Sequence, residues 1–102
     1  MSMVAAMTLV TGPAPEMAHI ARMAHDAIEE WLKAYEGYRG TIVFTDENAE
    51  RARIITLWET PAAEERSRKG RTEMRNRVVA TAGMSIAGVE LYDVPVCEVL
   101  RA

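Results

Sequence analysis

The chain has 102 residues, the size of a single domain, so we expect residues 1–102 to form one domain that buries its own core. Apolar residues make up 49% of the sequence and charged residues 26%, as in soluble globular proteins rather than disordered chains. The net charge of -3 argues against nucleic-acid binding, because domains that bind phosphate backbones are usually basic.

Cysteine content and hydropathy indicate the cellular compartment of the protein. A single cysteine excludes an internal disulfide framework and a zinc site built from several cysteines, and it fits a reducing compartment. No apolar run approaches the roughly 20 residues that a membrane-spanning helix needs. The first residues lack the basic region of a signal peptide. We therefore expect a cytoplasmic protein that does not bind membranes.

The first half of the chain has the pattern of a strand followed by a long helix. Residues 3–10 are small, apolar and partly β-branched, and they stop before Gly12-Pro13, which predicts a strand. From Pro15 onward, apolar side chains recur at helical spacing, and Gly37 is the expected left-handed cap. The apolar stripe comprises Met17, Ile20, Ala21, Ala24, Ile28, Trp31 and Tyr35.

The middle of the chain has the pattern of a β-hairpin. Residues 41–45 (TIVFT) and 51–60 (RARIITLWET) are rich in β-branched side chains, and the polar residues 46–50 between them predict a loop. Pro61 suits the first turn of a second helix, for which Thr60 is the predicted N-cap.

The second helix is predicted to end near Ala82, before a last strand over residues 89–100. Pro95 implies a bulge, an edge position or a break in that strand, because proline has no N–H to donate. The element order predicts an α+β fold, a ferredoxin-like βαββαβ sandwich. In this fold a four-stranded antiparallel sheet carries two helices on one face.

Both faces of the predicted sheet are apolar. Within residues 51–60, Ile54 and Trp58 alternate with Ile55 and Leu57, so each face receives large apolar side chains. Two helices cover only one face, and soluble monomers seldom expose a large apolar patch. We therefore expect a homodimer that packs sheet against sheet.

Three short motifs resemble one known family. Residues 36–40 (EGYRG) stand before a predicted strand, residues 57–61 (LWETP) open the second helix, and residues 89–92 (VELY) lie near the end. Over nearly the whole chain, this combination resembles the antibiotic-biosynthesis-monooxygenase type of dimeric α/β barrel. The resemblance implies a homodimer whose sheets close into a barrel, with a pocket between the sheet and helices of each protomer. Members of the family include cofactor-independent monooxygenases of polycyclic aromatic quinols and haem-degrading enzymes, as well as isomerases and decarboxylases.

The resemblance carries over to few individual residues. Trp58 matches the strand tryptophan that lines the pocket in several members. The haem-degrading members add a first-strand asparagine and a haem-ligating histidine on the second helix, and the monooxygenases also use the asparagine. This sequence has no asparagine in residues 3–10 and no histidine after His25. We therefore expect no bound cofactor, and no catalytic residue is assigned.

The second helix has small residues where a helix that packs on a sheet usually has large ones. Steps back from Met74 at helical spacing reach Gly70, Ser67 and Ala63. Two interpretations remain open. The small residues leave a ligand cavity over Trp58, or they reflect close helix–sheet packing or a helix that is kinked or broken near Gly70.

The same helix carries six basic residues between Arg66 and Arg77 against one acid, Glu73. Such a run forms a solvated face paired with nearby acids, or it attracts an anionic ligand, for which Arg71 is best placed. The predicted substrate-binding residues are Met7, Phe44, Thr56, Trp58, Ser67, Gly70, Arg71 and Met74.

The pattern around the histidines and the cysteine gives little indication of a catalytic role. His19 and His25 have no partners at metal-ligand spacing, so we expect no metal site. His25 is expected at the surface margin rather than as a general base. Cys97 is expected to be a buried strand residue rather than a nucleophile.

Three functional hypotheses follow. The first is a cofactor-independent monooxygenase-like protein that binds a hydrophobic aromatic molecule, since activated quinols need little beyond desolvation and positioning. The second is a non-catalytic dimeric module that binds a small apolar or anionic molecule. The third is a purely structural dimer with a filled core, in which Trp58 touches Met74.

Overall fold

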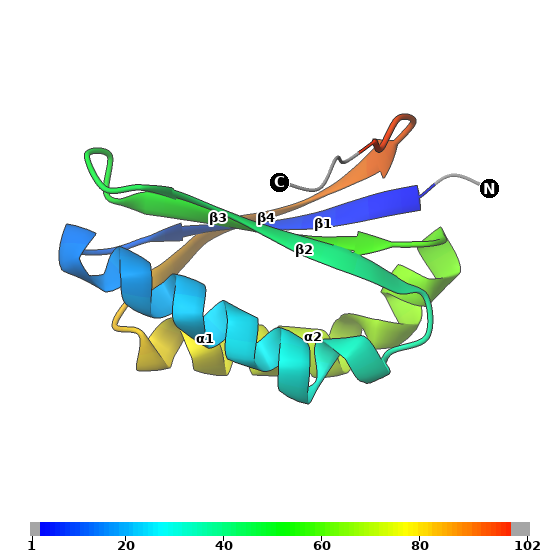
Figure 1. Ribbon diagram of the computed structural model, residues 1–102, viewed down its shortest axis with the longest axis horizontal. Helices are drawn as coiled ribbons and strands as arrows, with labels where there is room; N and C mark the ends of the chain where they lie inside the picture. Colours follow the sequence, from blue (N-terminus) through cyan, green and yellow to red (C-terminus); the bar gives the residue numbers. More distant parts are fainter. Residues whose placement is uncertain (1–2, 99–102) are drawn as a thin grey trace.

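A four-stranded antiparallel sheet forms the centre of the fold in the computed structural model, which describes residues 3–98. The strand order is β2 (Tyr38–Asp46), β3 (Arg51–Trp58), β1 (Met3–Thr11) and β4 (Ser85–Val94). Two helices, α1 (Met17–Glu30) and α2 (Pro61–Thr81), cover one face and leave the other open (Figure 1). The ferredoxin-like α+β fold predicted from the sequence is confirmed.

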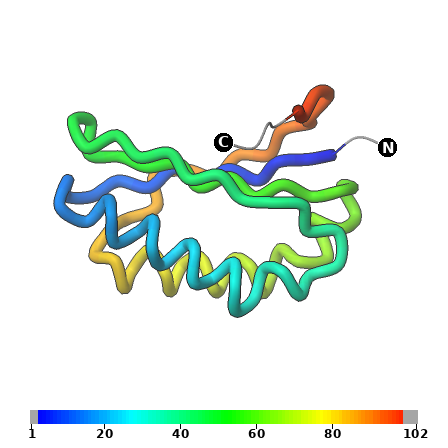
Figure 2. Tube along the Cα trace, viewed as in Figure 1, coloured from blue at the N-terminus to red at the C-terminus, as the bar shows by residue number. Residues whose placement is uncertain are grey.

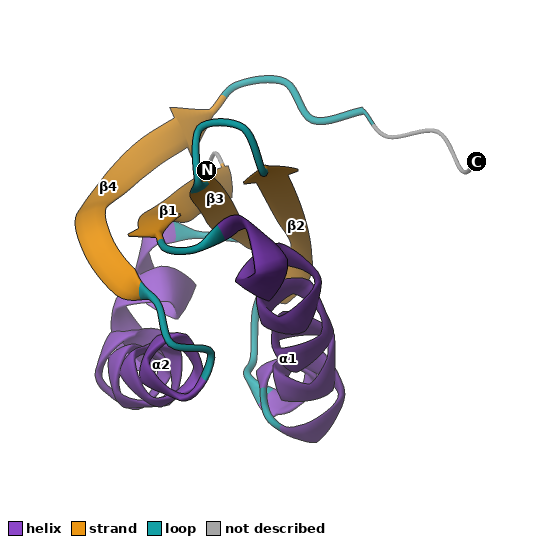
Figure 3. Cartoon of the chain, turned by 90° about the vertical axis from the view of Figure 1, so that its left-hand side faces the viewer, coloured by secondary structure: helices purple, strands orange, loops and turns teal. Residues whose placement is uncertain are grey.

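The two helices divide the covered face between them. Seen end-on, α1 lies beneath the β2 side of the sheet and α2 beneath the β4 side (Figure 3). The start of β1 and the end of β4 lie together at one end of the sheet (Figure 2), because Met3 pairs with Val94 in the antiparallel register.

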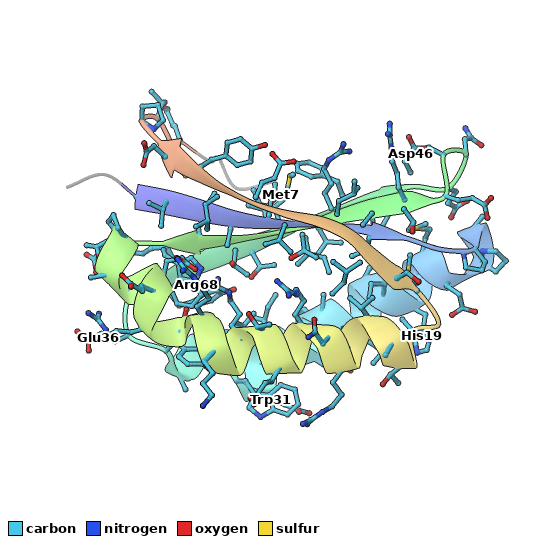
Figure 4. The ribbon with its side chains drawn as sticks, turned by 180° about the vertical axis from the view of Figure 1, so that it is seen from behind. Met7, His19, Trp31, Glu36, Asp46 and Arg68 are labelled. Carbon is cyan, nitrogen blue, oxygen red and sulfur yellow. The ribbon has the colours of Figure 1, made fainter. Side chains whose placement is uncertain are left out.

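The first helix ends earlier than the sequence predicted. Trp31 leaves the helical conformation with φ -130° and ψ -50°, and a short 3₁₀ turn, η2 (Leu32–Ala34), follows. The break turns Leu32 into the core and leaves Trp31 44% exposed. The predicted apolar stripe included Trp31 and not Leu32. Figure 4 shows Trp31 on the side of the helices that faces away from the sheet. Gly37 takes the predicted left-handed conformation, φ +83°, but in the turn before β2.

The second helix starts as predicted and runs without interruption. Thr60 is its N-cap, since its hydroxyl accepts a hydrogen bond from the backbone N–H of Ala63 at 3.1 Å. The helix continues through Gly70, so the break near this residue that the sequence left open as an alternative does not occur. A Cβ atom at Gly70 would lie 2.5 Å from the Tyr35 hydroxyl, so this glycine provides room for Tyr35.

The last strand lies earlier in the chain than predicted. It ends at Val94, and Pro95 follows it rather than interrupting it. The register against β1 shifts between Leu9 and Val10. Residues 99 and 100, which the predicted strand included, lie outside the described residues.

Candidate functional site

A small apolar cavity lies between the sheet and the two helices. Its floor consists of cross-strand neighbours: Thr56 of β3 pairs with Ala6 of β1 and Thr41 of β2, and Ile54 pairs with Thr8. The edge strand β4 contributes Val89. The helices form the roof with Ala24, Ala27, Leu32, Arg71, Met74, Arg75 and Val78.

The cavity exists because several facing side chains are short. Ala6 on the floor lies opposite Ala24 and Ala27 on the roof, and these methyl groups do not fill the space between the layers. The free volume is about 50 Å³, which holds a few water molecules. It is smaller than the roughly 300–1,000 Å³ of most small-molecule pockets. A bicyclic or tricyclic ligand therefore requires a wall side chain to move outward.

A buried polar network closes one end of the cavity. Arg71, 8% exposed, donates from Nη2 to Glu64 Oε2 at 2.5 Å and from Nη1 to Ser67 Oγ at 2.8 Å. Ser67 in turn donates to the Glu64 carbonyl at 2.8 Å, and Arg68 donates to the Glu64 carboxylate from the outer side. The Arg71 guanidinium is therefore held in one position by partners on its own helix.

Glu64 is ionised within this network despite its burial. Burial alone would raise the pKa of its carboxyl group, but hydrogen bonds from Arg68 and Arg71, and the charges of these residues, outweigh that effect. The pKa of Glu64 therefore lies below its ordinary value. The ion pair is complete at neutral pH, and it fixes the guanidinium that faces the cavity.

Trp58 lies behind the cavity wall and is fully buried. Its indole N–H donates to Thr56 Oγ1 at 2.9 Å, and the Arg71 guanidinium carbon lies 5.1 Å from the ring centroid. Tyr35 and Tyr38 contact the ring edge to face, with centroids 6.0 and 5.6 Å away. Within the described residues, Trp58 is thus a core side chain with a local hydrogen-bond partner, one of the two roles that the sequence left open.

The predicted binding residues fall into three groups. Thr56, Arg71 and Met74 line the cavity. Trp58 and Ser67 lie directly behind it and orient Thr56 and Arg71. Gly70 contributes no open space over Trp58, because the Tyr35 ring occupies the region between them.

Met7 and Phe44 lie on the wrong face of the sheet for this cavity, so their predicted position is wrong. Met7 pairs with Ile55, and Figure 4 shows its side chain on the open face. Phe44 pairs with Arg53 and is 54% exposed. Alternation separates the two faces of each strand, but the pairing of Thr41 with Thr56 decides which β2 residues share a face with Trp58.

Sequence reasoning missed three polar residues of the lining: Thr8, Thr41 and Arg75. Sheet alternation places Thr8 between Ala6 and Val10 on the helix-facing side. Arg75 lies one helical turn after Arg71, so it shares the same stripe of α2. Both signals were present in the sequence, whereas the position of Thr41 depends on the hairpin register.

The remaining candidates lie outside the site. The His25 side chain is 70% exposed, as expected for a surface residue. Cys97 follows β4 and is exposed, so its predicted burial in a strand is wrong. Residues 3–98 contain no group of His, Cys, Asp and Glu side chains placed to hold a metal ion. None of the helices in this range is both long and apolar enough to span a membrane.

Comparison with known proteins shows the fold but no similarity in sequence. No protein-family model matches the chain, and no curated protein is similar to it. The monooxygenase from the gene ActVA-Orf6 of Streptomyces coelicolor, solved in complex with nanaomycin D, superposes with a TM-score of 0.68 at 15% identity. That match covers 99% of this chain and 93% of the other.

Other solved structures share the fold. A candidate antibiotic biosynthesis monooxygenase from Bordetella bronchiseptica matches with a TM-score of 0.67 at 13% identity, over 98% of this chain and 100% of the other. One from Deinococcus radiodurans matches with a TM-score of 0.60 at 14% identity, over 97% of both chains. The chain therefore has the ferredoxin-like fold of antibiotic-biosynthesis-monooxygenase-type proteins.

Proposed function

We propose that this protein binds a hydrophobic aromatic small molecule in the cavity beneath the sheet and promotes its reaction with molecular oxygen without a bound cofactor. The cavity carries the proposal: it is walled by alanine, leucine, isoleucine and valine side chains, with a few hydroxyl and guanidinium groups at fixed positions. The complex of the Streptomyces coelicolor protein with nanaomycin D supports a small-molecule ligand for this fold.

The lining residues supply an environment suited to such a reaction. For an anthrone-like substrate, loss of a proton from the ring carbon gives a carbanion, and oxygen adds to that carbon. Loss of water from the hydroperoxide then yields the quinone, so one O₂ supplies the new carbonyl oxygen and one water. The apolar walls exclude solvent from the carbanion, and the cationic Arg75 favours the negative charge that spreads to its oxygen.

Met74 is the wall residue best suited to admit a ring system. It is partly exposed, lines the cavity and carries a flexible thioether. Its movement toward solvent would enlarge the space without disturbing the Glu64–Arg71 pair.

A non-catalytic binding module is the second candidate. Among the described residues, the side chains that line the cavity include no carboxylate, imidazole or thiol to accept the substrate proton. This observation favours binding without turnover. If the protein is an enzyme, the substrate must lose its proton to solvent at the cavity mouth, or be acidic enough to lose it without a protein base.

Oxygen consumption separates the two candidates. With anthrone as substrate, an oxygen electrode is expected to record uptake at least about tenfold above the uncatalysed rate, since positioning and desolvation act on a reaction that already proceeds slowly. Uptake at the uncatalysed rate by protein that still binds anthrone would contradict the enzymatic proposal and support the binding module.

We also propose that the protein is a homodimer joined through the open sheet face. This face exposes Ile42, Phe44 and Tyr92 to 39%, 54% and 48%. Met7 and Leu57 lie on the same face, so the exposed side chains belong to one contiguous apolar surface. Burial of this surface against a second copy would remove it from water.

Phe44→Lys is expected to convert the dimer into a monomer, because it places a charge within the proposed interface. Light scattering at micromolar concentration should give twice 11.3 kDa for the wild type and 11.3 kDa for the variant. Trp31→Lys is the matched control, since Trp31 is 44% exposed on the helical side, and it should remain dimeric. A monomeric wild type, or a dimeric Phe44→Lys, would contradict this interface.

A further inference from the structure

Arg75 is the one lining side chain whose charge has no counter-ion within residues 3–98. Its Nε atom is buried and has no hydrogen-bond acceptor among the described residues. Its Nη2 atom donates to the exposed side chain of Asn76 at 3.3 Å, a long contact with a neutral neighbour. A guanidinium has five N–H groups, so most of the binding capacity of Arg75 is free.

Arg71, the other arginine that lines the cavity, already has a counter-ion and hydrogen-bond partners. Its charge is neutralised by Glu64, its second nitrogen is bound by Ser67, and its face covers Trp58. An anion that approached Arg71 would have to compete with this network. The sequence-based choice of Arg71 as the group that attracts an anion is therefore less favourable than Arg75, one turn further along α2.

The surroundings of Arg75 favour an incoming negative charge. Burial and the nearby charge of Arg71 lower the pKa of Arg75, which nevertheless stays protonated at neutral pH. Around Glu64, the positive charges of Arg68 and Arg71 already exceed the single negative one. A partly buried cation beside this excess is unfavourable until an anion pairs with it.

We propose that the ligand of this cavity is an aromatic carboxylate, with its ring among the apolar walls and its carboxylate on Arg75. The proposal rests on the proposed binding function and adds the charge and class of the ligand. A carboxylate matches the planar fork of a guanidinium and takes two of its N–H groups at once. Ala24, Ala27 and Ile54 provide the apolar surface for the ring.

A matched pair of ligands and a matched pair of variants test the proposal. 1-Naphthoate and 1-naphthamide have nearly the same shape, and only the first is charged at pH 7. Arg75→Gln removes the cation that lines the cavity. Arg77→Gln removes an exposed cation from the same helix and changes the net charge by the same amount. Binding is measured by isothermal titration calorimetry at low salt.

The wild type is expected to bind naphthoate roughly 10- to 100-fold more tightly than naphthamide, as for a hydrogen-bonded charged group. Arg75→Gln should abolish this preference by weakening the binding of naphthoate far more than that of naphthamide, and Arg77→Gln should keep the preference. Equal binding of the two ligands by the wild type, or a preference that survives Arg75→Gln, would overturn the assignment of Arg75 while the proposed binding function stands. Failure of the wild type to bind naphthoate, naphthamide and nanaomycin D would overturn both.

Discussion

Glu64→Gln is expected to lower the free energy of unfolding by about 3–5 kcal/mol at pH 7, the usual effect of removing one partner of a buried ion pair. Glu64 is 2% exposed and binds Arg71 directly. Without the carboxylate, the Arg71 guanidinium remains buried against Trp58 with no opposite charge. Urea denaturation of the two proteins measures the difference.

Glu65→Gln is the matched control, because it removes the same charge from the next, exposed position of α2. Its effect should stay within about 0.5 kcal/mol. A loss below 1 kcal/mol for Glu64→Gln would mean that the network does not contribute to stability as its geometry indicates.

The stability difference between wild type and Glu64→Gln should also depend on pH. The pKa of Glu64 is lower in the folded protein than in the unfolded chain, so folding favours the ionised form. The contribution is therefore fully present above the ordinary glutamate pKa of about 4.3. It is lost as the pH falls through the lower pKa of the folded state. Denaturation curves at successive pH values should converge below that range, and a constant difference would contradict the assigned ion pair.

The fold was predictable because its signals are local. The strand alternation of residues 51–58, the polar hairpin loop and the Thr60 cap each determine a few neighbouring residues, and together they specify the element order. The end of α1 was not predictable in this way. The helical period continues to Trp31 and Tyr35 in the sequence, but the chain leaves the helix at Trp31 and buries Leu32 instead.

The candidate site was only partly predictable, because it depends on non-local register. Thr56 and Met74 were identified from strand alternation and helical spacing, and both line the cavity. Phe44 was misplaced because nothing within β2 alone states which of its faces meets the helices. The roles of Arg71 and Arg75 were also hidden, since their spacing makes them equivalent and only the position of Glu64 distinguishes them.

Ala24→Leu is expected to weaken ligand binding about 70-fold by filling the cavity. Ala24 is buried at the roof, and a leucine there projects into the free volume of about 50 Å³. The loss of about 100 Å² of apolar contact with a ligand corresponds to roughly 2.5 kcal/mol. Ala18→Leu adds the same atoms to an exposed position of α1 and should leave binding unchanged. Circular dichroism of both variants checks that they are folded.

Tryptophan fluorescence measures this effect most directly. In a Trp31→Phe background, Trp58 is the only tryptophan, and its indole is hydrogen-bonded to a residue of the cavity floor. Titration with nanaomycin D should change its emission in a saturable way in this background and with Ala18→Leu, and the change should disappear with Ala24→Leu. Emission that does not respond in the parent, or an affinity that Ala24→Leu leaves unaltered, would contradict the assignment of the cavity as the ligand site.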